Sequence, residues 1–199
     1  MQSVLSITDA HSARESASRK VLEKAKLTHK AHLMLDPAFF INTANLKTSV
    51  DENCPQGHLA ISMRSETMGM RLANKTVRAG GKINVANQLS YQFTLDLCQQ
   101  YLEAEEGNVV VLYIQTIADK KLGEAIAAKV AETYNPARIK LIRPNTVDEY
   151  LSYLARASFV VASRFHALIL ALTLGKPVFG TAFGVHGHKV PGLFDICGT

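Results

Sequence analysis

The fold of this chain is decided by residues 158–172, which read SFVVASRFHALILAL. Residues 158–162 form an apolar, strand-like run, and residues 167–172 follow a helical pattern. Ser163, Arg164, Phe165 and His166 lie between them. The stretch therefore predicts a strand that leads, through a short polar turn, directly into a helix.

The junction between this strand and this helix suits an anion. The first N–H groups of a helix have no intrahelical acceptor, and the helix dipole places a partial positive charge there. Arg164 adds a permanent positive charge, His166 an imidazole that titrates near neutral pH, and Ser163 a hydroxyl. We expect an anionic substrate to bind here, with Ser163 either donating to it or capping the helix.

The composition is that of a globular chain with a sizeable core, since 47% of its 199 residues are hydrophobic. No apolar run approaches the roughly 20 residues of a membrane span, and the first residues lack the features of a signal peptide. We therefore expect no membrane span and a cytoplasmic location. Cys54, Cys98 and Cys197 are far apart and odd in number, which favours reduced structural thiols.

The formal net charge of +5 favours small acidic ligands over nucleic acid. The 22 Lys and Arg residues are spread along the chain without a run of five or more, and no aromatic and basic platform is visible, so we expect no nucleic-acid partner. His166, His186 and His188 raise the question of a metal. The loop around the last two has no acidic neighbour, so we expect no metal and no cofactor.

Strand and helix signals alternate from His58 to Gly180 in the order β-α-β-α-β-α-β-α-β. This order predicts an α/β fold with a doubly wound parallel sheet, Rossmann-like, with right-handed crossovers and helices on both faces. Ligands of such sheets bind beyond the carboxyl ends of the strands. Arg64 ends the first of these strands, so we expect it to lie near the segment from Ser163 to His166.

The N-terminal part shows a separate pattern. Residues 12–15, Ser-Ala-Arg-Glu, have the form of a capping box and predict a helix that runs to about Leu27. Residues 30–35 read as a strand closed by a turn at Asp36 and Pro37. The polar stretch that follows, residues 42–57, reads as a linker between two structural units.

Two helices of the second unit carry further expectations. A helix from about residue 85 to 105 has apolar side chains at steps of four, which predict the stripe that packs against the sheet: Leu89, Phe93, Leu97 and Tyr101. The next helix is expected to begin at Asp119. Asp119 and Glu124 are interpreted as ordinary acids of a helix start and a solvent-exposed face.

Residues 163–178, SRFHALILALTLGKPV, resemble the signature of the polysaccharide pyruvyl transferase family. Other segments are similar to that family as well: residues 187–190 with their lysine, residues 14–16 and 35–39, and residues 61–64. The resemblance spans nearly all of the chain. It implies the C-terminal half of a GT-B-like fold, in which two Rossmann-like domains face each other across a cleft.

The resemblance also implies a division of the chain. Residues 1–41 correspond to a remnant of the first, acceptor-side domain, residues 42–57 to a linker, and residues 58–199 to the donor-binding domain, truncated at its C-terminus. Three departures from the family pattern stand out. Nearly all of the first domain and the closing helices are missing, and the loop of residues 181–188 is long and lacks the customary Tyr-Asp before the lysine.

The resemblance implies a transferase of polysaccharide biosynthesis, exopolysaccharide included, that moves pyruvate from phosphoenolpyruvate to a sugar acceptor as a cyclic ketal. Phosphoenolpyruvate carries a phosphate and a carboxylate, for which Arg164 and Arg64 offer two guanidinium groups. On this interpretation His166 and Arg164 are catalytic, with His166 transferring protons. The donor contacts would come from Arg64, Ser163, Lys189 and His188.

Other functions stay open on the sequence. A GT-B glycosyltransferase that uses a nucleotide sugar would have the same helix start available for a diphosphate. A non-catalytic fragment would instead act as an interaction module through the surface that a missing domain covers. The sequence does not identify the acceptor sugar or the oligomeric state, so a homo-oligomer and a chain inactive by itself both stay open.

Overall fold

The computed structural model describes residues 11–14, 16–27, 31–44, 46, 54–65, 85–182 and 189–198. Its main unit is built on a five-stranded parallel sheet that contains β3 (His58–Ser62), β4 (Val110–Tyr113), β5 (Ile139–Ile142), β6 (Ala157–Ala162) and β7 (Val178–Gly180). The strands lie in the order β5-β4-β3-β6-β7, so the direction of strand addition reverses between β3 and β6. This order confirms the expected doubly wound, Rossmann-like α/β fold.

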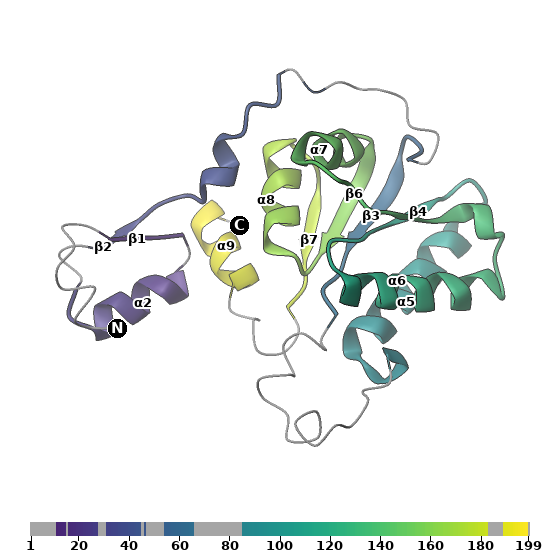
Figure 1. Ribbon diagram of the computed structural model, residues 1–199, viewed down its shortest axis with the longest axis horizontal. Coiled ribbons are helices and arrows are strands. Elements are labelled where there is room, and N and C mark those ends of the chain that lie inside the picture. Colours follow the sequence, from purple (N-terminus) through teal and green to yellow (C-terminus); the bar gives the residue numbers. More distant parts are fainter. Residues whose placement is uncertain are drawn as a thin grey trace.

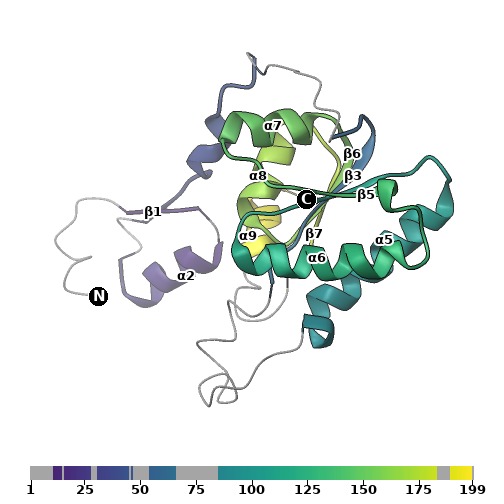
Figure 2. The same ribbon diagram turned by 45° about the vertical axis from the view of Figure 1, so that its right-hand side comes forward.

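Helices cover both faces of this sheet (Figures 1 and 2). One face is covered by α5 (Leu89–Ala104), which follows the short 3-10 helix η3 (Val85–Asn87), and by α6 (Ile117–Ala131). The other face is covered by α7 (Val147–Ala155), α8 (Phe165–Thr173) and α9 (Lys189–Cys197). A second 3-10 turn, η4 (Pro136–Arg138), leads into β5. No helix within the described ranges is both long enough and apolar enough to cross a membrane.

The core is divided by the sheet into two apolar layers. Along β3, Leu59 and Ile61 contribute to the layer under α5 and α6, whereas Ala60 between them contributes to the layer under α7 and α8. Successive side chains of a strand point to opposite faces, so a strand covered on both faces is mainly apolar, and its buried polar groups need hydrogen-bond partners. All residues of β3 and β4 are buried, and the two polar side chains of β3, His58 and Ser62, are hydrogen-bonded to Tyr113 and Tyr150.

A smaller unit precedes the sheet and lies beside α9 (Figure 1). It contains β1 (His11–Ala13), α2 (Ser16–Lys24), β2 (Ala31–Leu33) and the 3-10 helix η2 (Pro37–Phe40). The predicted capping box of residues 12–15 is wrong, because Ser12 pairs with His32 in a parallel ladder and the helix begins only at Ser16. At these residues the pairing of β1 with β2 outweighs the local sequence signal for a helix start. The predicted linker, residues 42–57, lies partly outside the described residues.

The buried face of α5 also differs from the predicted stripe. Leu89 is 68% exposed, and Phe93, Leu97 and Tyr101 are only half-buried. The fully buried apolar side chains are instead Tyr91, Leu95, Cys98 and Leu102. Steps of four residues drift by about 40° per step around a helix, whereas the observed spacing of four, three and four stays on one side. The helical period of 3.6 residues therefore determines which apolar side chains of α5 pack against the sheet.

His58, the buried first residue of β3, is hydrogen-bonded to Tyr113, the last residue of β4. His58 donates from Nδ1 to the Pro55 carbonyl at 2.7 Å and accepts at Nε2 from the Tyr113 hydroxyl at 2.9 Å, which uses both nitrogens of a neutral imidazole. Burial, together with the nearby charges of Arg156 and Lys176, lowers the pKa of His58 to about 4, against the opposing effect of the Pro55 carbonyl. The imidazole is therefore neutral in the folded chain at neutral pH.

This histidine makes stability depend on pH. Because the unfolded chain binds the proton near pH 6.5 and the folded chain only near pH 4, the free energy of unfolding should fall by about 3 kcal/mol as the pH drops through this window. Urea unfolding at several pH values should show a flatter profile for His58→Gln. The matched control His32→Gln, at an exposed position, should keep the wild-type slope. Parallel profiles for wild type and His58→Gln would contradict the assignment.

Candidate functional site

Two strand ends meet where the strand order reverses. Ser163 follows β6, and its N–H donates to the carbonyl of Ser62 at the end of β3, at 3.1 Å. The Ser163 Oγ in turn accepts the backbone N–H of Arg64 at 2.7 Å. The sequence interpretation of Ser163 as a helix cap is wrong, because Arg164 holds the N-cap position of α8 and Ser163 ties the two strand ends together. Its hydroxyl hydrogen is still available for donation.

The Arg164 side chain forms an ion pair with the buried carboxylate of Asp119. Its Nη2 donates to Asp119 Oδ2 in a short ion pair and to Thr116 Oγ1 at 3.3 Å. The Arg164 side chain is only 16% exposed, so it is not the freely solvated cation of an ordinary helix start. Its Nε is buried and has no acceptor among the described residues. Asp119 and Thr116 thus hold one nitrogen of the guanidinium, Nη2, in place, and further N–H groups of Arg164 are available for hydrogen bonds.

Asp119 connects the segment after β3, the start of α6 and the start of α8. Its side chain, 2% exposed, accepts the N–H of Ser65 beyond β3 at 3.2 Å and the N–H of Thr116 at 3.0 Å, in addition to Arg164. The interpretation of Asp119 as an ordinary acid of a helix start is therefore wrong. Helix α6 begins at Ile117, with Thr116 and Asp119 forming a reciprocal capping box. The Thr-x-x-Asp spacing of residues 116–119 was the sequence signal that could have revealed this role.

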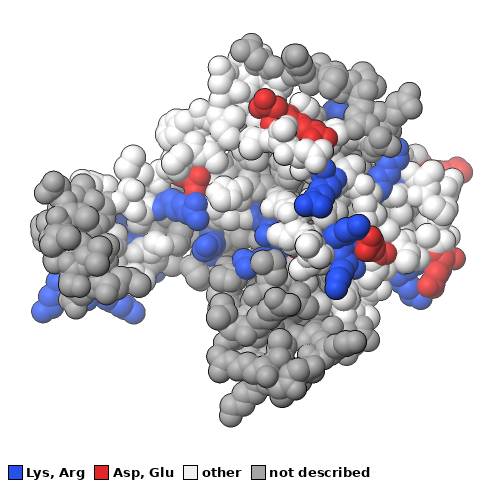
Figure 3. Space-filling view, viewed as in Figure 1, with Lys and Arg blue, Asp and Glu red and all other residues white. Residues whose placement is uncertain are grey.

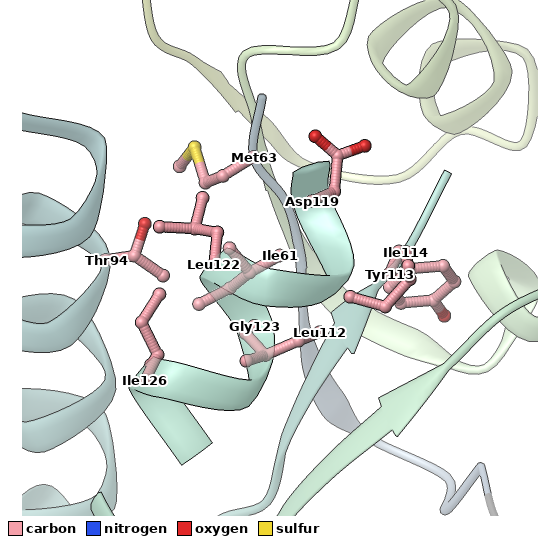
Figure 4. A pocket seen from close by; sticks show the side chains of 10 residues that line it. All are labelled: Ile61, Met63, Thr94, Leu112, Tyr113, Ile114, Asp119, Leu122, Gly123 and Ile126. Carbon is pink, nitrogen blue, oxygen red and sulfur yellow. The ribbon is translucent and has the colours of Figure 1, made fainter. Parts of the chain in front are cut away.

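A small cavity of about 10 Å³ lies beneath Asp119, between β3, β4, α5 and α6. Figure 4 shows apolar side chains such as Ile61, Leu122 and Ile126 around it, with the Asp119 carboxylate at the first turn of α6 pointing away from them. A cavity of this size holds at most one water molecule. This cavity is therefore too small for a substrate.

Arg64 adds a second cation to this edge. Burial and the neighbouring charge of Arg164 lower the pKa of Arg64, and Asp119 opposes this effect only in part. Its guanidinium makes no hydrogen bond or ion pair within the described part of the chain. Two arginines thus share one carboxylate, which leaves an excess positive charge at the strand ends. An arrangement of this kind is stabilised by an added anion.

The start of α8 offers further groups for an anion. No side chain caps this helix, and the first-turn N–H groups of Phe165, His166 and Ala167 have no intrahelical acceptor. These groups carry the positive end of the helix dipole. The first turn of α8 follows directly after Arg164, so the N–H groups and the arginine belong to one electropositive edge.

His166 stands on this first turn and is 58% exposed, with Nε2 3.9 Å from Asp36 Oδ2. His166 is therefore not packed between the helix and the sheet. The imidazole is accessible for proton exchange with a ligand bound at the helix start. The structure thus brings His166, Arg164, Arg64 and Ser163 to the same edge of the sheet.

Lys189 is the first residue of α9, so a helix follows the strand series directly after residues 181–188. A Cβ built on Gly180, which ends β7, would approach Val190 to 2.6 Å, so the start of α9 lies at the carboxyl end of β7. His188, predicted to contact the donor, lies outside the described residues, as does His186.

The remaining surface shows neither a metal site nor a continuous basic patch in the part that can be described. No group of three or more His, Cys, Asp or Glu residues within the described ranges is arranged to hold a metal ion. On the face seen in Figure 3, Lys and Arg side chains lie in separate groups, with acidic residues between some of them.

Comparison with known proteins identifies the family. The family described as polysaccharide pyruvyl transferase matches residues 1–183, and the chain belongs to it. No curated protein matches the chain. The S. aureus MnaA-UDP co-structure aligns with 99% of this chain and 52% of its own, at 13% identity and a TM-score of 0.58. A Methanocaldococcus jannaschii UDP-GlcNAc 2-epimerase in complex with UDP-GlcNAc and UDP aligns with 88% of this chain and 46% of its own, at 14% identity and a TM-score of 0.58.

At these identities the likeness shows the fold alone. Both structures are of the GT-B type, which agrees with the expected correspondence of this chain to one half of such a fold. The chain spans about half the length of these proteins. Their nucleotide ligands therefore say nothing by themselves about the ligand of this chain.

The removal of one partner from the buried ion pair between Asp119 and Arg164 should be costly. Asp119→Asn removes the charge that compensates a largely buried guanidinium, and we expect the free energy of unfolding to fall by about 3 kcal/mol in urea titrations. The double variant with Arg164→Gln should lose at least about 1 kcal/mol less than the sum of the two single losses. Glu124→Gln, an exposed acid on the same helix, should stay within about 0.5 kcal/mol of wild type. Strict additivity would contradict a direct coupling.

Proposed function

We propose that this member of the polysaccharide pyruvyl transferase family binds phosphoenolpyruvate at the carboxyl ends of β3 and β6 and transfers its pyruvyl group to a sugar of a polysaccharide or its precursor, as a cyclic ketal. The main support is the pair Arg64 and Arg164 beside the uncapped start of α8. This pair lies where the strand order reverses, the place where parallel α/β sheets bind ligands. The family membership supplies the reaction class.

The charges of phosphoenolpyruvate match those of the site. The donor presents a carboxylate and a phosphate, and the site presents two guanidinium groups and the first-turn N–H groups of α8. Asp119 holds Arg164 in place before the ligand arrives, so little side-chain entropy is lost when the anion binds. Arg64, without a partner of its own in the described structure, takes the second anionic group.

His166 supplies the proton transfers. It protonates the methylene carbon of phosphoenolpyruvate, which makes the adjacent carbon electrophilic, and it regains a proton from the first sugar hydroxyl as that oxygen adds. The phosphate then leaves with the electron pair of the broken C–O bond. The second hydroxyl closes the ketal ring, and its proton leaves with the phosphate. One donor and two hydroxyl groups thus give one ketal and one inorganic phosphate.

Ser163, Lys189 and His188 complete the proposed donor contacts. Ser163 Oγ lies at the junction of the two strands and retains a hydrogen to donate. Lys189, at the start of α9, adds charge for the departing phosphate from the end of β7. On this proposal residues 1–41 belong to the acceptor side and residues 42–57 to the linker, so the choice of sugar belongs with the first unit. We place the reaction in the cytoplasm, where phosphoenolpyruvate is made.

Calorimetry tests the donor site directly. Phosphoenolpyruvate should bind the wild-type chain and raise its melting temperature, and Arg64→Ala should weaken binding by about tenfold or more, because one charge-assisted contact is lost. The matched control is Arg143→Ala, an exposed arginine that follows the edge strand β5 as Arg64 follows β3. Binding of UDP or UDP-GlcNAc without phosphoenolpyruvate would instead support a nucleotide-sugar enzyme. Self-association without any ligand response would support an interaction module.

The role of His166 is tested by phosphate release from phosphoenolpyruvate in the presence of acceptor. His166→Ala should lower kcat about 100-fold, since general acid and base assistance is lost, while the affinity for phosphoenolpyruvate should stay within a few-fold of wild type. His32→Ala, at an exposed position of the first unit, should leave both constants unchanged. A kcat for His166→Ala within a few-fold of wild type would remove His166 from the chemistry.

A further inference from the structure

A buried carboxylate of the first unit reaches the exposed histidine of α8. Asp36 Oδ2 lies 3.9 Å from His166 Nε2, and the carboxylate is 4% exposed. Asp36 is followed at once by η2, which packs against α8. The contact therefore joins two packed elements, and it brings a residue of the first unit to the edge where Arg164 and Arg64 lie.

The Asp36 carboxylate is held on both oxygens. As the N-cap residue of η2 it accepts the N–H of Ala38 on Oδ1 at 3.0 Å, and Oδ2 accepts from Arg14 Nη1 at 2.6 Å. The Arg14 guanidinium lies 5.0 Å from the ring centre of Phe165, the residue next to His166. Since the carboxylate is anchored and the imidazole is exposed, His166 is the partner that adjusts.

The charge on Asp36 is stable. Burial by itself would raise the pKa of Asp36, but the hydrogen bonds from Ala38 and Arg14, with the positive charges of Arg14 and His166, outweigh burial and hold the pKa below its usual range. A fixed negative charge therefore faces the imidazole throughout the range in which histidine titrates.

We propose that Asp36 is the positioning residue of His166. It receives the Nε2–H of the imidazole and leaves Nδ1 as the nitrogen that exchanges protons with the substrate. It also stabilises the imidazolium that forms between the two proton transfers. The present 3.9 Å is an ion-pair separation rather than a hydrogen bond, so the proposed role requires the exposed ring to move closer to Asp36.

Arg14 completes this arrangement. While His166 is neutral, Arg14 keeps the buried carboxylate paired, so no isolated charge is left in the apolar contact between η2 and α8. When His166 takes up a proton, Asp36 is shared between the two cations. The role of Asp36 in turnover rests on the proposed function, because only there does His166 act on a substrate.

Histidine ring NMR tests the inference without any substrate. In a chain labelled with ¹⁵N on the imidazole rings, the signals of His166 are assigned by their loss in His166→Gln. Asp36→Asn keeps the acceptor for Ala38 but removes the charge, so the Nε2–H tautomer of His166 should lose population. Arg14→Gln should have the opposite effect, because it removes the competing cation.

The controls separate positioning from folding. The charged groups around this contact in the described structure are Asp36 and Arg14, with Arg164 two residues before His166. Asp195→Asn, an exposed acid of α9 that contacts Ser16, should leave the tautomer population of His166 unchanged. An unchanged tautomer population of His166 in a folded Asp36→Asn chain overturns the inference. Should that variant fail to fold, an unchanged tautomer population of His166 in Arg14→Gln overturns it instead.

Kinetics then distinguish this inference from the proposed function. Asp36→Asn should lower kcat for phosphate release about tenfold with KM for phosphoenolpyruvate within about twofold, and should have no further effect in the His166→Ala background. A normal NMR response without any pyruvyl transfer would overturn the proposed function and leave the contact of Asp36 with His166 intact. Pyruvyl transfer with no NMR response would overturn the role of Asp36 alone.

Discussion

The ion pair between Asp119 and Arg164 is the interaction on which the site depends. It joins the start of α6 to the start of α8, and the second oxygen of Asp119 holds the backbone beyond β3 through Ser65. Three segments that lie far apart in the sequence therefore meet at one buried carboxylate. Without this charge the two arginines would repel each other at the strand ends; with it they form a stable, still electropositive edge.

The proposed chemistry needs both units of the chain. The sheet supplies Arg64, Ser163 and Arg164, whereas the carboxylate that faces His166 comes from the segment before η2. A proton-transfer residue whose orientation depends on the other unit couples the state of that unit to the reactivity of the donor site. The packing of η2 against α8 is therefore part of the proposed active site and more than a connection between units.

Most of the fold could be predicted from the sequence because its signals are local. The apolar runs of β3 and β4 can be covered only by helices on both faces, and the alternation of strands and helices allows few arrangements other than a doubly wound sheet. Arg64 and the segment from Ser163 to His166 could be placed together because the carboxyl ends of parallel strands share one edge. The predictions for residues 12–15 and for the α5 stripe were wrong where strand pairing and the 3.6-residue period outweighed simpler patterns.

The sequence by itself determined the class of fold and placed Arg64, Arg164 and His166 at one edge of the sheet, which we propose as the ligand site. Only the tertiary structure decided how these groups are paired: that Asp119 is a buried partner of Arg164, that Ser163 binds the Arg64 N–H rather than capping α8, that Lys189 begins a helix and that Asp36 faces His166. The reason is physical. Strand and helix periodicity can be recognised within about ten neighbouring residues. The partner of a buried charge, in contrast, depends on which distant segments the packed sheet brings within a few ångströms of it.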